Sequence, residues 1–408
     1  MERLEHKGYD LSARLREAPV VECLKRYIAY QRSVRRSPDG VQFPKYGPVS
    51  INLDLTTACN FSCPHCMDSR LLNSGDYLDL ETVKRSIDTL QKNGLQSVII
   101  VGGGEPTLHK NFEEIARFIS ERGLQIGIVT NGSRLEKVRE AADRFQEGDW
   151  LRISIDAGKE STFFKSHRPR GRFTLKGILE HAQQIKSLNP KITLGCSYMI
   201  VWDGISVNGH ELTPNISEMD QAVSLAREHS FDYVSFKPCL LRLDDSQKES
   251  VFEIPDPQRA SRIIEDIKNN LAKAREAGGT GVRIIESVDL DAMLNEKVHE
   301  LKIQPDVCHS QFFRAVFAAG GIFHCPAFRG LEQAKIGDAA GYRGKANLDF
   351  TNVRLEHSIR SFNAKHECSM VVCLYHHVNW WIENFIASDK DVSEIRVVDV
   401  SNFFPDSF

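Results

Sequence analysis

The chain has 408 residues, 41% of them hydrophobic, and its 52 basic and 55 acidic side chains give a formal net charge of -3. That length predicts one large domain with one or two smaller ones, and the near balance of charge gives no reason to expect nucleic acid or a membrane as a main partner. The longest apolar run, at residues 312–323, is interrupted and too short to cross a bilayer.

Residues 1–48 are predicted to form a helical extension. Apolar residues recur along residues 23–30, basic residues follow them, and Pro38-Asp39-Gly40 would end the helix. We expect the apolar side of this helix to dock on the main domain and its basic side to be solvated.

From residue 49 onward, short apolar runs alternate with amphipathic segments, and Asp79 is placed to cap one of the predicted helices. Serial strand–helix units imply a parallel sheet with right-handed crossovers, so the fold class is α/β, as a barrel or an open part of one. The predicted strands are 49–55, 98–101, 124–129, 150–155, 192–200 and 233–236, and the predicted helices are 80–90, 111–122, 135–145, 173–188 and 216–229.

The pattern changes in the last third of the chain. Residues 240–305 add helical segments and one further strand at 282–285. Residues 312–317 and 322–324 flank Ala318-Ala319-Gly320-Gly321 and are predicted to form a β-hairpin, and a last helix is expected at 377–387. We therefore divide the chain into an extension (1–48), a main domain (49–305) and a C-terminal domain (306–408).

Three cysteines lie on one short loop after the first predicted strand. Cys59, Cys63 and Cys66 have the spacing C-x3-C-x2-C, and no fourth cysteine follows nearby. Three thiolates can hold three irons of a four-iron cluster and leave the fourth iron open to another ligand, whereas a structural zinc knuckle needs four protein ligands. Ten cysteines in a chain that begins with charged residues, not a secretory signal, predict a reduced, cytoplasmic protein whose thiols bind metal.

Further polar motifs follow the other predicted strands. Because parallel barrels place their active sites at the carboxyl ends of their strands, we expect these groups on one face. Glycines let the backbone approach a ligand closely, and a glutamate can hold an ammonium group, although each motif alone could be an ordinary turn. The motifs are Gly102-Gly103-Gly104-Glu105 after the second strand, Asn131 after the third, Ser154 and Asp156 at the fourth, and Lys237 after the sixth.

These motifs, Cys59/Cys63/Cys66, Gly103-Gly104-Glu105 and Ser154/Asp156, resemble the radical S-adenosylmethionine (SAM) enzyme superfamily over residues 49–240. The resemblance implies a partial (β/α)6 TIM-like barrel, a [4Fe-4S] cluster on the three cysteines, and SAM chelated to the open iron. It also implies an electron donor such as flavodoxin or ferredoxin. Its electron would cleave SAM to methionine and a 5′-deoxyadenosyl radical, which abstracts hydrogen from a substrate.

The resemblance also implies roles for single residues. Glu105, with the backbone of Gly103 and Gly104, would hold the amino group of SAM. Ser154, Asp156 and Asn131 would face its ribose, and Arg168 would contact its carboxylate. His65 occupies a position that is commonly aromatic in the family, and its imidazole would lie against adenine.

A second group of cysteines lies in the C-terminal domain. Cys308 and Cys325 bracket the predicted hairpin in the pattern C-x11-G-x4-C, and Cys368 and Cys373 complete a set of four that would satisfy either zinc or a second [4Fe-4S] cluster. His376 and His377 are rival ligands. The pattern resembles the auxiliary-cluster domains called SPASM and twitch, and four cysteines fit the shorter twitch form, a small α+β domain.

We expect an enzyme that abstracts hydrogen from a small molecule, such as a sugar or a phosphorylated or carboxylated metabolite. The second cluster would then transfer electrons or bind substrate. Lys237, at a strand end, would point into the barrel mouth as a catalytic group, and the basic run 167–172 could bind phosphate or carboxylate or simply be solvated.

Two alternatives remain open from the sequence. The first is a maturase that cross-links, oxidises or epimerises a ribosomally made precursor peptide. Many such relatives carry an N-terminal winged-helix module that binds a leader peptide, and residues 1–48 are too short and too helical for it. The second is a non-catalytic iron-sulfur protein, which would leave the SAM-contacting motifs unexplained.

Overall fold

A single large sheet organises the fold of this computed structural model. Its neighbours run in the order β11-β8-β5-β4-β3-β2-β1-β12-β13-β14, and every pair from β11 to β12 is parallel. The strands of this sheet are β1 Ser50–Asp54, β2 Ser97–Ile100, β3 Gln125–Thr130, β4 Trp150–Ser154, β5 Thr193–Ile200, β8 Tyr233–Pro238, β11 Arg283–Glu286, β12 Arg314–Ala318, β13 Gly321–Phe323 and β14 Lys335–Gly337.

The structure describes residues 14–37, 40–207, 209–242, 249–251 and 253–398. The ends of the predicted extension and C-terminal domain, 1–13 and 399–408, and Pro38 and Asp39 of the predicted helix stop lie outside the described residues. Within the described part, no helix combines the length and hydrophobicity that a membrane span requires. Two short hairpins, each a separate two-stranded sheet, are β6 Ser206–Val207 with β7 His210–Glu211 and β9 Leu240–Arg242 with β10 Glu249–Val251.

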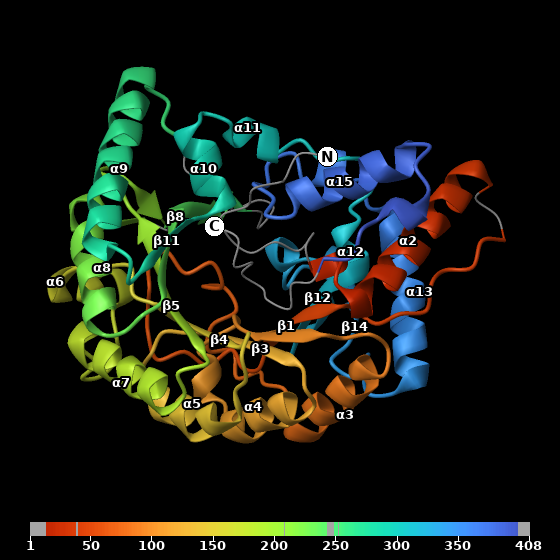
Figure 1. Ribbon diagram of the computed structural model, residues 1–408, viewed down its shortest axis with the longest axis horizontal. Helices are drawn as coiled ribbons and strands as arrows, with labels where there is room; N and C mark the ends of the chain where they lie inside the picture. Colours follow the sequence, from red (N-terminus) through yellow and green to blue (C-terminus); the bar gives the residue numbers. More distant parts are fainter. Residues whose placement is uncertain (1–13, 38–39, 208, 243–248, 252, 399–408) are drawn as a thin grey trace.

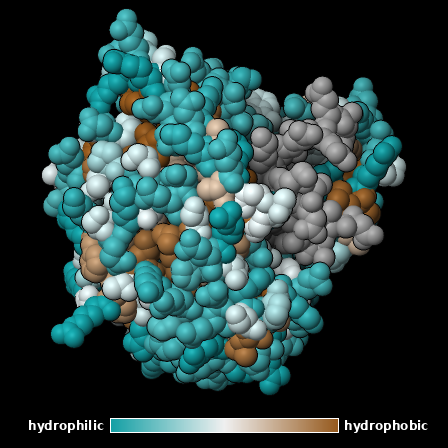
Figure 2. Space-filling model, turned by 60° about the vertical axis from the view of Figure 1, so that its left-hand side comes forward, coloured by the Kyte–Doolittle hydropathy of each residue, from teal (hydrophilic) through white to brown (hydrophobic). Residues whose placement is uncertain are grey.

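Helices cover the convex side of the curved sheet (Figure 1). This arrangement confirms the predicted α/β fold and its partial barrel of strand–helix units, and the face that Figure 2 turns forward is mainly hydrophilic with small apolar patches. The barrel helices are α3 Leu80–Gln91, α4 Phe112–Glu121, α5 Leu135–Ala141, α6 Glu160–His167, α7 Leu175–Leu188, α8 Met219–Glu228 and α9 Pro257–Gly278, followed by α10 Val288–Leu294 and α11 Val298–Leu301.

Local chemistry explains where these helices begin and end. The Asp79 carboxylate accepts a hydrogen bond of 2.9 Å from the Thr82 backbone N–H, so the predicted cap of α3 is confirmed. Gly123 follows α4 with φ +68°, a conformation that glycine adopts without steric cost. The apolar faces of both helices are buried against the sheet.

The two faces of the sheet differ in chemistry. Alternate residues of β1, such as Ile51 and Leu53, pack under the helices in the main core. The intervening residues Asn52 and Asp54 are polar yet buried, and they lie on the concave side. Concave-side residues of other strands form a small separate cluster that contains Trp150 and Tyr233. The concave side therefore offers polar groups near the strand ends.

The predicted hairpin is present, and its first strand extends the barrel sheet. β12 pairs in parallel with β1, from Ser50 opposite Arg314 to Asp54 opposite Ala318, and antiparallel with β13. The predicted start at residue 312 is wrong, because Ser310–Phe313 forms the short helix α12, whose Ser310 N–H donates to the side chain of Asn379. The boundary at 305/306 stays a prediction.

The remaining elements surround this extension of the sheet. The last predicted helix is confirmed, and a longer helix before it was not predicted. These helices are α13 Lys345–Ser361, α14 Ala364–Glu367 and α15 His376–Ala387, and the N-terminal helix is α2 Ala18–Arg36.

The N-terminal helix packs on C-terminal elements, chiefly α15. Tyr27 is fully buried, and its hydroxyl lies 3.0 Å from Nδ1 of His309, the residue after Cys308. Nε2 of His309 lies 2.9 Å from Oε2 of Glu383, and Arg35 contacts the same carboxylate oxygen at 2.6 Å. This chain of contacts holds α2, Cys308 and α15 together.

We expect Glu383→Gln to weaken this junction by about 2 kcal/mol, the usual worth of a hydrogen bond to a charged group. The hydrogen bond from His309, with help from Arg35, lowers the pKa of Glu383 to about 2. This stabilisation is therefore present above pH 4.5 and is lost as the pH falls toward 2. Urea unfolding of both proteins at pH 7 and at pH 3 measures it. An equal difference at the two pH values would contradict the assignment.

Candidate functional site

The three-cysteine loop leaves β1 and turns tightly between its last two cysteines. The Cys66 N–H donates to the Cys63 carbonyl at 3.1 Å. Burial raises the pKa of Cys66 to about 12, and burial together with the neighbouring Cys66 and Cys59 thiols raises that of Cys63. Three adjacent, half-buried thiols form a donor set that fits a cluster with one open iron, and binding it would release their protons.

The glycine run packs against the beginning of the cysteine loop. The Gly104 N–H donates to the Thr56 carbonyl at 2.7 Å, and the Glu105 N–H donates to the Ala58 carbonyl at 2.8 Å. A Cβ atom on Gly104 would lie 2.1 Å from the Ala58 oxygen, and Gly103 has φ +69°. The expected close backbone approach is present, and here its partner is the cysteine loop itself.

Glu105 is buried and accepts hydrogen bonds from its own chain. Its Oε1 accepts from the Thr107 N–H (3.1 Å) and hydroxyl (2.6 Å) and from the Thr130 hydroxyl (2.6 Å), and its Oε2 accepts from the Asn131 N–H at 2.7 Å. Burial raises the pKa of Glu105, and these hydrogen bonds oppose that effect. Oε2 accepts one of these four hydrogen bonds and Oε1 accepts three, so Oε2 is the oxygen that could accept from a further donor such as an ammonium group.

The Asn131 side chain bridges two loops. Its Nδ2 donates to Oδ1 of Asn60 in the cysteine loop at 3.1 Å, and its Oδ1 accepts from the Ser133 N–H at 2.9 Å. The structure thus brings Asn131 next to the cysteine loop and uses its amide to position that loop. Its predicted contact with ribose stays a prediction.

Asp156 lies deeper than the sequence suggests. It has φ +46°, and its Oδ1 accepts from the Met199 N–H at 2.6 Å. Its Oδ2 lies 3.7 Å from Nε2 of His65 and 3.4 Å from Nε2 of His167. Ser154 is half-buried on the concave side of the same strand. Asp156 therefore links the cysteine loop to the barrel wall, and both predicted ribose contacts stay predictions.

His167 is a site residue that the sequence reading assigned to a basic surface run. It is buried, its Nε2 lies 3.0 Å from the Ile155 carbonyl, and its Nδ1 lies 3.3 Å from Sγ of Cys63. The sequence contained one signal for this buried position: His167 lies four residues after Phe163, and residues with that spacing share one face of a helix. With Cys63 and His65 it also forms a group whose ligand atoms lie within 4.8 Å of one another.

Arg168 and Lys237 occupy different environments. Arg168 has φ +44° at the end of α6, its carbonyl accepts from the Ser62 N–H at 3.2 Å, and its side chain is exposed. Lys237 is half-buried at the end of β8. Burial lowers the pKa of His65 to about 4, and the nearby Asp156 carboxylate opposes this shift. The roles predicted for Arg168 and Lys237 stay predictions.

Arg329 joins the cysteine loop to the C-terminal cysteines. Its Nε lies 2.8 Å from Oδ2 of Asp54 at the end of β1, and its Nη1 donates to both Asp68 oxygens at 2.7 Å. Asp68 follows Cys66 by two residues, and Arg329 follows Cys325 by four. Burial raises the pKa of Asp54 to about 7, and Arg329 opposes the shift. We call this contact the Arg329 bridge.

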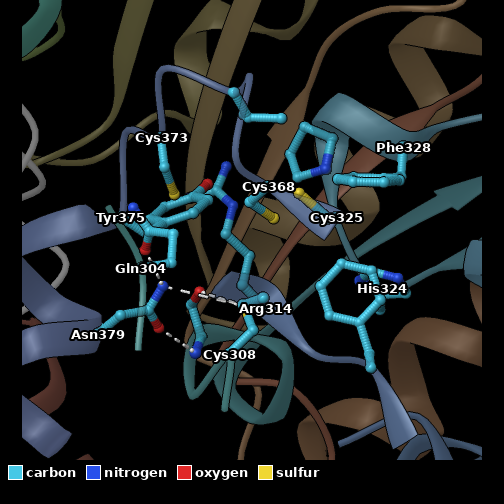
Figure 3. A pocket seen from close by; sticks show the side chains of 15 residues that line it. Gln304, Cys308, Arg314, His324, Cys325, Phe328, Cys368, Cys373, Tyr375 and Asn379 are labelled. Carbon is cyan, nitrogen blue, oxygen red and sulfur yellow. Dashed lines mark hydrogen bonds between the residues drawn. The ribbon is translucent and has the colours of Figure 1, made fainter. Parts of the chain in front are cut away.

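The four C-terminal cysteines line one pocket. Figure 3 shows Cys325, Cys368 and Cys373 around it, with Arg314 and Tyr375 among them. Burial, with a smaller contribution from the Cys308 and Cys325 thiols, raises the pKa of Cys373. Four thiols around one pocket supply the ligand type of either a four-iron cluster or zinc.

Polar groups surround this pocket. Nδ2 of Asn379 donates to Sγ of Cys308 at 3.9 Å, and the Ser310 hydroxyl lies 3.4 Å from the same sulfur. Arg314 also donates to Oδ1 of Asn52 on β1. His376, a rival ligand in the sequence, accepts instead from Nε2 of Gln304, 3.1 Å from its Nδ1.

Known proteins resemble this chain in sequence and in fold. Residues 53–209 match the model of the Radical SAM superfamily. An S-adenosylmethionine-dependent nucleotide dehydratase of Selenomonas ruminantium is 34% identical over 108 residues, 26% of this chain and 39% of that protein. The mycofactocin maturase MftC of Mycolicibacterium smegmatis is 30% identical over 130 residues, 31% of this chain and 32% of that protein. The matches therefore span about a third of these curated relatives.

The structural likeness is more extensive. SuiB of Streptococcus suis bound to S-adenosylmethionine superposes with a TM-score of 0.58 at 14% identity, over 91% of this chain and 80% of that one. At that identity the likeness concerns the fold. It includes the barrel and the C-terminal extension of the sheet.

We expect Glu105→Gln to weaken SAM binding at least tenfold, because the amide keeps the shape of the side chain but removes the charge that would attract an ammonium group. Isothermal titration of SAM into the anaerobically reconstituted proteins measures the affinity. Glu121→Gln, an exposed substitution on α4, is the control. Unchanged SAM affinity in Glu105→Gln would refute the ammonium role.

Arg329→Gln should destabilise the protein by about 3 kcal/mol, since it leaves the buried Asp54 carboxylate and the half-buried Asp68 carboxylate without their cation. Adding Asp54→Asn should recover part of the lost stability, because the second change removes a buried carboxylate that no longer has its cation. Denaturant unfolding of the two single variants and the double variant gives the coupling free energy. Additive effects would show that the bridge does not act as a unit.

Proposed function

Because this chain belongs to the radical SAM superfamily, we propose that it reductively cleaves SAM and abstracts a hydrogen atom from a small-molecule substrate, a sugar-like or a phosphorylated or carboxylated metabolite. The observation that carries the proposal is the joint position of Cys59, Cys63 and Cys66 against the Gly104–Glu105 turn. When bound, the cluster would supply one electron to SAM, whose cleavage gives methionine and a 5′-deoxyadenosyl radical.

Side chains of this chain would bind the cluster and SAM. Cys59, Cys63 and Cys66 would hold three irons, and Oε2 of Glu105 would accept from the SAM ammonium. The hydrogen bonds from Thr107, Thr130 and Asn131 support this role, because they favour the ionised carboxylate in spite of its burial.

We further propose that Cys308, Cys325, Cys368 and Cys373 hold a second [4Fe-4S] cluster. Four protein thiols would fill its coordination, which favours electron transfer over direct ligation of substrate. The Arg329 bridge supports this proposal, because it connects the segment after Cys325 with the segment after Cys66. An electron left by oxidation of the substrate could then pass to the second cluster.

A second candidate is maturation of a ribosomally made precursor peptide. The similarity to the maturase MftC favours it. The similarity to a nucleotide dehydratase favours a small substrate. Within residues 14–37 and 40–48, the structure describes helical and irregular segments and no strand edge to which a leader peptide could add. We therefore prefer the small substrate, and the electron donor would be a flavodoxin or a ferredoxin in either case.

Iron and sulfide analysis with electron paramagnetic resonance (EPR) tests the assignment of two clusters. Anaerobic wild-type protein should hold about eight irons per chain, and a Cys59/Cys63/Cys66→Ala variant about four. Cys59→Ala alone should abolish 5′-deoxyadenosine formation. A triple variant with no iron and one zinc would instead make the C-terminal cysteines a structural zinc site.

A further inference from the structure

One segment beside the cysteine loop is strongly basic. Residues 161–179 contain five lysines and arginines and no acidic residue, although the whole chain has 52 basic and 55 acidic side chains. All five basic side chains are exposed. We call them the cationic patch: Lys165, Arg168, Arg170, Arg172 and Lys176.

The cationic patch is fixed to the backbone between the first two cysteines. The Arg170 N–H donates to the Asn60 carbonyl at 2.9 Å, and Phe61 and Pro169 form an antiparallel bridge. The Arg170 Nε donates to the Ser62 hydroxyl, also at 2.9 Å. The part of the patch around Arg170 therefore lies beside the loop that carries Cys59 and Cys63.

Acidic neighbours neutralise only part of the patch. Glu160, which precedes it, accepts hydrogen bonds from the Leu175 N–H at 2.8 and 3.1 Å. Glu180, which follows it, lies 3.7 Å from Lys176. Within the described part of the chain, Lys165, Arg168 and Arg172 have no ion pair with an acidic side chain. Phe164, 41% exposed, adds an apolar contact of the kind that protein interfaces use near their centres.

We propose that the cationic patch is the docking surface for an acidic one-electron donor protein of the flavodoxin or ferredoxin type. This inference rests on the proposed function, because reductive cleavage of SAM needs an electron from outside the chain. Docking here would bring the donor next to the cysteine loop, and one electron would pass from the reduced donor, which is thereby oxidised. Complementary charge would steer the encounter and make it sensitive to salt.

Charge reversal tests the proposal through binding alone. Lys165→Glu/Lys176→Glu changes the net charge as much as Lys268→Glu/Lys273→Glu, a control on the exposed side of α9. Isothermal titration with oxidised flavodoxin, and separately with ferredoxin, gives the dissociation constants at low and high salt. Lys165→Gln/Lys176→Gln is a milder variant that removes the two charges without reversing them. Arg168 is left intact because of its predicted contact with SAM.

At low salt we expect the reversal variant to bind the donor at least about tenfold more weakly than wild type, the neutral variant to lie between them, and the control to stay within about twofold. The differences should shrink at 0.5 M salt, where charges are screened within a few ångströms. Equal weakening in the α9 control, or donor affinity unchanged by reversal, would overturn the proposal.

Dithionite separates this inference from the proposed function, because a small chemical reductant needs no docking surface. The reversal variant should cleave SAM with dithionite at the wild-type rate. Loss of that activity with unchanged donor affinity would overturn the docking proposal and assign the patch to the active site. Failure of wild type to cleave SAM with dithionite would refute the proposed function, whatever the donor affinity.

Discussion

The parallel pairing of β1 with β12 is the constraint on which the rest of the structure depends. β1 has β2 on one side and β12 on the other, so the loop that leaves β1 lies beside the C-terminal segment. The buried polar side of β1 also contacts the C-terminal segment: Arg314 donates a hydrogen bond to Asn52, and Arg329 forms an ion pair with Asp54. Buried charges of this kind are costly without partners, so the two cysteine groups are held in one relative position.

Around that junction, the loops at the strand ends support one another. Gly104 and Glu105 bond to the backbone of the cysteine loop, Asn131 reaches Asn60, and Asp156 approaches His65. The predicted SAM contacts Glu105, Asn131 and Asp156 therefore also position the loop that carries the cysteines. These residues would thus both contact SAM and position the cysteine loop. This explains why polar residues that would be expected to face a ligand are already hydrogen-bonded within the chain.

The barrel could be predicted because its strands and helices have local signatures. Buried parallel strands are short apolar runs, and caps such as Asp79 mark helix starts. Pairings between distant segments leave no such signature: neither Arg329 nor the parallel partner of β1 could be inferred from spacing. A charged residue within a buried strand, Asp54, was the one hint. His167 was misread because three arginines follow it, although its helical spacing from Phe163 points inward.

The central claim is that the two cysteine groups would bind clusters that differ in coordination. The cluster on Cys59, Cys63 and Cys66 would keep one iron open to SAM, whereas cysteines would bind every iron of the cluster in the C-terminal pocket. EPR spectra of the anaerobically reduced protein, recorded with and without SAM, test this claim most directly. The account predicts two cluster signals, of which SAM shifts only one, and that one is missing in the Cys59/Cys63/Cys66→Ala variant. A SAM-dependent shift that persists in this variant, or no shift in the wild type, would contradict it.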